Sequence, residues 1–333
     1  MSDTLGRKRS MILTAGAAGL GALLIAVAPT YAAVGILAPI LLVVRRTIQG
    51  LAHGGEMPAA GAFIAEAAKP DNGGAWSSLI YVFGTIGASF GVLLGAILAQ
   101  TISPDDLNSW GWRLAFGLGA LGSFAAMLYR MRMRETEIFT KQVAAQGVPQ
   151  ESLLKAVWRA RGTAIKIIGL TVGLTVGYYL WTTVLTAYHI SVLGPQTPSY
   201  HRGSDNSSVL WVTLAANVWF ILTLPVWGIV SDRIGRKPVL WIATIGTAIV
   251  SVPLLGWVDS SIFRLGVTLF IANFFTAAAA SIFPGLLTEL VPTRIRTIGV
   301  GVPYAIAVAL FGGTAPYLQT WMSTNWGLPS FAW

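Results

Sequence analysis

The sequence contains no cysteine among its 333 residues, so disulfide bonds and thiolate metal sites are excluded. Charged residues make up only 11% of the chain, whereas soluble domains carry about 25%. There are three histidines, and none forms an H-x-x-H pair that could bind a metal. We also find no nucleophile motif and no phosphate-binding loop. These absences argue against an enzyme.

Apolar residues are abundant instead, at 54% of the chain. They gather in runs of about 20 residues, the length that a helix needs to cross a bilayer. We therefore predict an all-α, polytopic membrane protein embedded in the lipid bilayer. The nine predicted spans are about 11–28, 34–65, 76–100, 111–129, 164–190, 209–231, 239–258, 264–290 and 298–322.

The basic residues explain the net charge of +9 without a nucleic-acid partner. If the first loop is cytoplasmic and the spans alternate in direction, most lysines and arginines fall on the cytoplasmic side, as the positive-inside rule requires. We expect a multi-pass protein of the inner membrane. Its first residues would be cytoplasmic and the last residues of this chain external.

One short motif occurs twice. Residues 2–8 read S-D-T-L-G-R-K and residues 231–237 read S-D-R-I-G-R-K, and each copy leads into a long apolar run. The glycine permits a tight turn, and the aspartate can cap a helix or pair with an arginine. We predict a cytoplasmic gate in which such pairs hold two helix bundles together; the alternative is a loop that only fixes topology. The predicted gate residues are Asp3, Gly6, Arg7, Asp232, Arg233, Gly235, Arg236 and Lys237.

The repeat divides the chain into two homologous halves. We expect an N-terminal bundle at 1–129, a cytoplasmic linker at 130–163 and a C-terminal bundle at 164–333. Two spans precede the second copy of the motif, whereas none precedes the first. The sequence therefore predicts nine of twelve helices, without the first two and the last.

Other motifs indicate a family. Arg46-Thr47-Ile48-Gln49-Gly50 and Gly54-Gly55-Glu56 lie in one predicted span. Together with the two loops, they resemble the major facilitator superfamily and, within it, the metabolite:proton symporter family of α-ketoglutarate permeases and proline/betaine transporters. The resemblance implies two pseudo-symmetric bundles, a midplane site for a small molecule and alternating access. It also implies a monomer that is driven by the proton gradient and needs no cofactor.

The span 34–65 carries a polar stripe. Arg46, Gln49, His53 and Glu56 fall within an arc of about 80° on a helix. Charges inside a membrane usually face a cavity or a partner. We expect Arg46 to attract an anionic substrate and Glu56 to couple transport to protonation. The alternative is a structural Arg–Glu or Arg–Gln pair, and His53 is more typical of a satisfied interior histidine.

Polar side chains also interrupt other apolar spans. Tyr178, Tyr179, Asn273 and Tyr304 could line the cavity and hydrogen-bond the substrate, although tyrosine is common at membrane interfaces. A second pattern is glycine at helical spacing in span 76–100, at positions 84, 87, 91 and 95. It predicts the close approach of another helix.

The sequence thus predicts proton symport of a small organic acid, such as a dicarboxylate. A proline- or betaine-type osmolyte is the alternative substrate. A different class stays open as well, namely a truncated, non-transporting membrane remnant or sensor.

Overall fold

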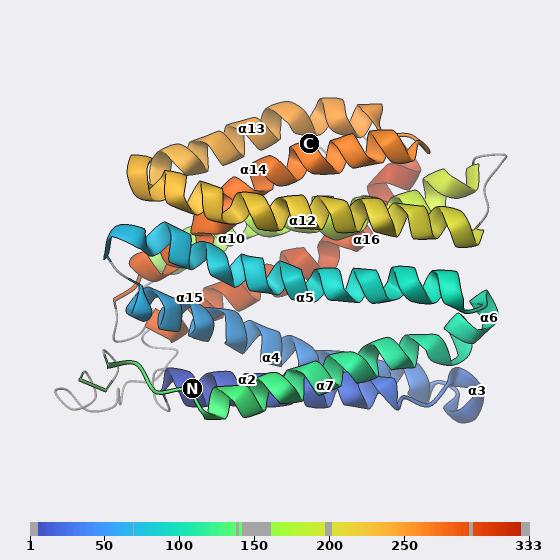
Figure 1. Cartoon of the computed structure of the whole chain (residues 1–333), viewed down its shortest axis with the longest axis horizontal. Coiled ribbons are helices and arrows are strands. Elements are labelled where there is room, and N and C mark those ends of the chain that lie inside the picture. The colour runs from blue at the N-terminus through green and yellow to red at the C-terminus, as the bar shows by residue number, and fades with distance from the viewer. Residues whose placement is uncertain are drawn as a thin grey trace. The chain divides into compact units, whose positions relative to one another are not determined.

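The computed structural model describes residues 6–68, 70–137, 140–141, 161–196, 202–292 and 296–327 (Figure 1). Its regular structure in these ranges is helical, without a strand. Seven helical stretches there are long and apolar enough to cross a membrane: Arg7–Ala26, Gly73–Thr101, Ser109–Met131, Arg161–Leu193, Asn206–Ile234, Arg236–Trp257 and Ile262–Glu289. Many large apolar side chains on these helices are exposed, as expected of surfaces that face lipid.

The other two predicted spans are helical too. Span 34–65 corresponds to α4 (Leu37–Ala67), which is 31 residues long but carries Arg45, Arg46 and Glu56. Span 298–322 corresponds to α15 (Arg296–Ala307), the π-helical turn η7 (Val308–Gly312) and α16 (Gly313–Trp326). The predicted all-α membrane fold is therefore confirmed. Most of the predicted linker 130–163 lies outside the described residues.

The chain forms two compact units, which are described separately. The first contains Met1–Ala67, Ile102–Ala164 and Thr288–Val302. In it, α2 (Arg7–Ala26) packs along both α4 and α7 (Trp112–Met131). Glycines allow this contact, because a Cβ on Gly19 would lie 3.0 Å from the ring of Phe124. Three short segments complete the unit: α3 (Tyr31–Val34), α6 (Pro104–Asp106) and the π-helical turn η2 (Leu107–Gly111).

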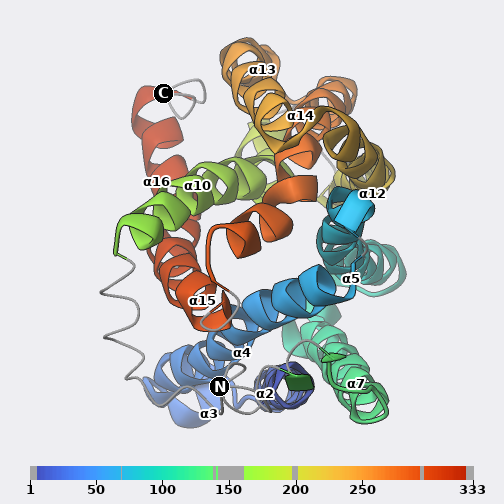
Figure 2. The same cartoon turned by 90° about the vertical axis from the view of Figure 1, so that its left-hand side faces the viewer.

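The second unit contains Ala68–Thr101, Ile165–Leu287 and Pro303–Trp333. Its main contact joins α5 (Gly73–Thr101) to α12 (Arg202–Ile234), which run side by side in Figure 1. Figure 2 shows α13 (Arg236–Trp257) and α14 (Ile262–Glu289) beside α12. One further span consists of α10 (Arg161–Tyr179), η3 (Leu180–Val184), α11 (Leu185–Tyr188) and η4 (His189–Leu193). Two single 3-10 turns are also present, η1 (Pro70–Asn72) and η5 (Gly194–Gln196). The predicted division at 130–163 follows the sequence repeat and stays a prediction.

The interior of the second unit is built around Trp181. This side chain is fully buried in an apolar cluster to which α12 contributes Ala216 and α14 contributes Leu265 and Leu269. Trp181 lies in η3, a π-helical turn. Such turns interrupt a regular helix and are frequent near functional sites.

Close helix approach occurs at a different place from the one predicted. Apart from the neighbouring backbone of α5 itself, no described atom lies within 4 Å of the Cβ positions of Gly84, Gly87, Gly91 or Gly95, so the predicted close approach of another helix is not seen at this stripe. The close contact is made by Gly74 and Gly228 instead, where a Cβ on Gly74 would lie 2.6 Å from the Gly228 carbonyl oxygen. Glycine spacing within one helix does not reveal which face its neighbour covers.

The two motif copies share an uncommon backbone conformation. Gly6 precedes α2 with φ 99° and ψ 161°, and Gly235 precedes α13 with φ 93° and ψ 164°. This region of backbone space is essentially restricted to glycine. The internal repeat is thus present in three dimensions as two equivalent turns that start two equivalent helices.

Substituting Gly235 with alanine should lower the free energy of unfolding by about 1–3 kcal/mol, because the alanine Cβ is sterically strained in this backbone region. Thermal unfolding of the purified protein in detergent measures the effect. Gly84→Ala is the matched control, since Gly84 is helical and has open space around its Cβ position. An equal loss in both variants would contradict the assignment.

Candidate transport site

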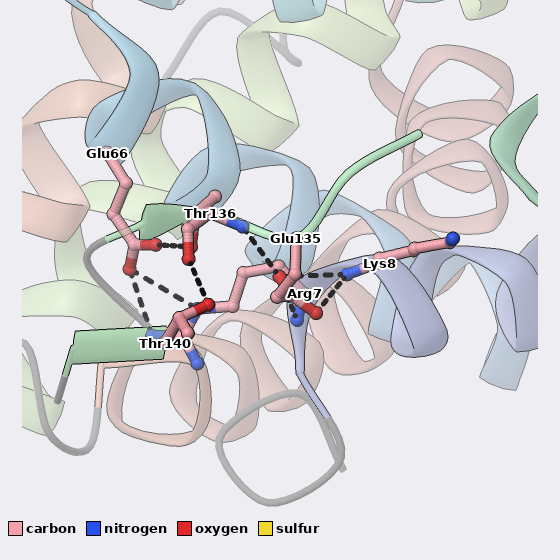
Figure 3. A network of polar contacts seen from close by, with 6 residues as sticks. All are labelled: Arg7, Lys8, Glu66, Glu135, Thr136 and Thr140. Atoms are coloured by element: carbon pink, nitrogen blue, oxygen red, sulfur yellow. Dashed lines mark hydrogen bonds and ion pairs between the residues drawn. The ribbon is translucent and has the colours of Figure 1, made fainter. Parts of the chain in front are cut away.

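The first motif copy is held by a buried ion pair. The Arg7 guanidinium donates to Oε1 of Glu66, at 3.0 Å from one terminal nitrogen and 3.3 Å from Nε (Figure 3). The two side chains are 1% and 0% exposed. The second carboxylate oxygen of Glu66 accepts from the Thr136 hydroxyl at 2.6 Å. The start of α2, the end of α4 and the segment after α7 are therefore joined through one carboxylate.

Glu135 binds the start of α2 in a different way. Its carboxylate accepts hydrogen bonds from the backbone N–H groups of Arg7 at 3.1 Å and of Lys8 at 3.2 Å (Figure 3). These are the first N–H groups of the helix, which have no partner within it. A carboxylate at this position also interacts favourably with the helix dipole.

The second copy makes an analogous contact with another helix. Asp232 accepts from the backbone N–H of Gly74 at 2.7 Å and from that of Ala75 at 2.9 Å. It thereby caps the N-terminus of α5. Arg236 donates to Asp232 at 2.9 Å and to the Ser231 hydroxyl at 2.9 Å, so it holds the capping carboxylate in place.

The remaining predicted gate residues differ in their surroundings. Arg233 and Lys237 are exposed. Gly6 and Gly235 form the turns described above. Asp3 lies outside the described residues.

Only Arg46 and Gln49 of the polar stripe on α4 are hydrogen-bonded to each other. Arg46 donates to the Gln49 side-chain oxygen at 2.9 Å, and its guanidinium lies 5.1 Å from the ring centre of Phe116 on α7. His53 is exposed, which differs from the interior position we expected. Glu56 lies ten residues beyond Arg46, or about 15 Å along the helix, so the two cannot pair directly.

Glu56 pairs with a residue that sequence reasoning did not single out. Arg130, near the end of α7, donates to Glu56 at 2.5 Å and to the Met11 carbonyl at 3.0 Å. Arg130 thus connects α7 to both α4 and α2. The only sequence signal was a basic residue at the end of a predicted span, which gives no partner.

The predicted substrate residues of the second unit are three tyrosines and Asn273. Tyr178 forms edge contacts with Tyr179 at 6.0 Å between ring centres and with Tyr81 at 5.8 Å. Tyr304 is buried. Asn273 is also buried; its amide nitrogen lies 3.5 Å from the Ala216 carbonyl oxygen, and its own side-chain oxygen has no hydrogen-bond partner. Tyr81 was not predicted, although it is a polar group in an apolar span like the others.

The described part of the chain contains no group of three His, Cys, Asp or Glu side chains that could bind a metal ion. The polar groups there include ion pairs, helix caps, side-chain amides and neutral hydroxyl groups. Such groups can bind, orient and release a solute without covalent chemistry.

Comparison with known proteins agrees with this description. The family model of the Major Facilitator Superfamily matches residues 1–200 and 187–333. The chain is 31% identical to the alpha-ketoglutarate permease of Escherichia coli K12, over 100% of this chain and 74% of the permease. It is 29% identical to a citrate-proton symporter of Salmonella typhi, over 96% and 71% of the two chains. A proline/betaine transporter of Escherichia coli K12 is 26% identical, over 99% and 67%.

Solved structures show the same fold. The proton:xylose symporter XylE matches with a TM-score of 0.73 at 18% identity, covering 100% of this chain and 78% of XylE. The Escherichia coli fucose:proton symporter FucP matches with a TM-score of 0.67 at 16% identity, covering 99% and 81%. These relatives are membrane transporters and not enzymes. The helical membrane fold, the repeated loop motif and the matching family model together show that this chain belongs to the Major Facilitator Superfamily.

Proposed function

We propose that this protein is a secondary transporter of the inner membrane that carries a small organic acid, such as a dicarboxylate, together with protons by alternating access. The observation that carries the proposal is the charge of Arg46. Its hydrogen-bond partner is the neutral amide of Gln49, and among the described residues no carboxylate pairs with it. An uncompensated cation inside a membrane helix is costly unless it serves an anion or a water-filled path.

Proton coupling is assigned to Glu56. In this structure the carboxylate is paired with Arg130, which also binds the Met11 carbonyl. Protonation of Glu56 would remove the charge that holds Arg130 and would loosen the connection between α4 and α7. Uptake of a proton would then change how these helices pack, which is what a symporter requires.

Of the two motif copies, the second is assigned to the cytoplasmic gate, because Arg7 of the first copy pairs with Glu66 within the N-terminal half of the sequence. Asp232 belongs to the C-terminal half of the sequence and caps α5, which belongs to the N-terminal half. We propose that this cap breaks and reforms as the halves move. The positive-inside pattern supports the orientation in which the first residues are cytoplasmic and the last residues of this chain are external.

Uptake into proteoliposomes tests the assignment. The protein should accumulate radiolabelled α-ketoglutarate or citrate when the external medium is more acidic than the lumen, and a protonophore should abolish the accumulation. Empty liposomes are the control. Accumulation of betaine or proline instead would favour the osmolyte alternative, which the names of several relatives support. Absence of uptake for every compound would overturn the proposal and favour a non-transporting membrane sensor.

A further inference from the structure

One face of α5 carries a row of hydroxyl groups. Tyr81, Thr85 and Ser89 are four residues apart and therefore lie along one side of the helix. Thr85 is 2% exposed and Ser89 is 8% exposed. Neither hydroxyl has a hydrogen-bond partner in the described part of the chain, not even the carbonyl one turn earlier that such side chains commonly use.

Aromatic hydroxyl groups from two other helices gather at this row. Tyr178 of α10 lies edge-on to Tyr81 at 5.8 Å and also contacts Phe220 of α12 at 5.9 Å. Tyr304 of α15 lies within electrostatic range of the phenol groups of Tyr81, Tyr178 and Tyr179. Phenol-bearing side chains of α5 and α10 are thus in ring contact, and the buried Tyr304 of α15 lies near them.

Three of these four phenol groups have no hydrogen-bond partner among the described residues. Tyr81, Tyr179 and Tyr304 make no hydrogen bond to another described residue, although each can donate one. The Tyr178 phenol approaches Thr85, whose hydroxyl nevertheless lacks a hydrogen bond of ordinary geometry. Polar groups that are buried at membrane depth normally find a partner, because no bulk water is present there. The Thr85 and Ser89 hydroxyls are buried without a partner, and the half-buried side chains of Tyr81 and Tyr178 lie beside them, so this group of donors is available to a bound molecule.

We propose that Tyr81, Thr85 and Ser89, together with Tyr178 and Tyr304, form a neutral subsite that binds a carboxylate group of the transported organic acid. Every member can donate a hydrogen bond, and a carboxylate only accepts and has several acceptor positions. Hydrogen bonds to an ionised acceptor are stronger than those between neutral groups. The sequence of α5 contains no charged residue that would repel or replace the carboxylate. This inference rests on the proposed function and names a binding site for it.

Cysteine labelling tests the subsite directly, because the chain contains no native cysteine. Thr85→Cys and Ser89→Cys should react with the small reagent methanethiosulfonate ethylammonium, and α-ketoglutarate should slow this labelling about tenfold through lost access and added hydrogen bonds. Thr101→Cys, at the exposed end of the same helix, is the control and should react at the same rate with and without the acid. Labelling of both site variants that neither α-ketoglutarate nor citrate slows would overturn the proposal.

Removal of single hydroxyl groups gives a second test that preserves side-chain shape. Tyr81→Phe and Tyr304→Phe should each raise the KM for α-ketoglutarate about tenfold, because one charge-assisted hydrogen bond is lost. Tyr317→Phe is the matched control, since Tyr317 is 72% exposed. Site variants that behave like Tyr317→Phe would show that the tyrosines serve packing only. If the unmodified protein transports no acid, the proposed function fails, while protection from labelling still decides whether this subsite binds a carboxylate.

Discussion

Glu66→Gln will destabilise the protein by about 3–5 kcal/mol, because it removes the negative charge that Glu66 places beside the buried guanidinium of Arg7. The Arg7 and Glu66 side chains are 1% and 0% exposed, so water cannot take over the lost interaction. The same carboxylate also accepts from Thr136, and the segment after α7 loses part of its attachment as well. Thermal unfolding in a mild detergent, followed by circular dichroism, measures the loss.

A double replacement separates the cost of an unpaired charge from the value of the pair. Arg7→Met combined with Glu66→Leu removes both charges and keeps apolar volume, so it should recover most of the stability that Glu66→Gln loses. Lys141→Ala is the exposed control, because the Lys141–Glu137 pair lies on the surface and should contribute at most about 1 kcal/mol. A Glu66→Gln variant as stable as Lys141→Ala would mean that the buried pair does not hold α2 to α4.

Hydropathy predicted where the helices lie, because an apolar run of about 20 residues in a membrane has to form a helix. The first residues of the helices were predicted less accurately. The spans predicted from about residues 11 and 239 begin at Arg7 and Arg236, directly after the glycine turns. The backbone of Gly6 and Gly235 ends the loop there, and basic side chains at the start of a helix do not prevent helix formation when carboxylates are near.

The partners of the site residues were harder to predict. Arg7 pairs with Glu66 across 59 residues of sequence, and Arg130 pairs with Glu56 across 74. A helical-wheel argument sees only one helix, so it grouped Glu56 with Arg46 and could not include Arg130. The hydroxyl row at Tyr81, Thr85 and Ser89 was missed for a related reason, because serine and threonine in an apolar helix usually bond to their own backbone.

Arg46→Gln should lower proton-driven uptake of α-ketoglutarate at least about 100-fold, because an anion loses the cation that compensates its charge in a membrane interior. Glutamine is shorter than arginine but keeps a neutral hydrogen-bonding group at this position. The loss is therefore expected to reflect charge. Initial rates in proteoliposomes, over a range of substrate concentrations, separate a change in KM from a change in maximal rate.

Two further variants of α4 show whether a loss of uptake in Arg46→Gln is caused by the lost charge at this position. Arg46→Lys keeps the charge but not the planar geometry, so partial uptake is expected, since lysine does not form the paired contacts that arginine makes with a carboxylate. Arg45→Gln changes the adjacent arginine, which lies about 100° around the helix and outside the polar stripe, and uptake should stay within about threefold of the unmodified protein. Full uptake by Arg46→Gln at normal expression would contradict the role of Arg46. Loss of uptake in Arg45→Gln alone would move the anion-binding role to Arg45, one of whose guanidinium nitrogens is buried without a partner in the described residues.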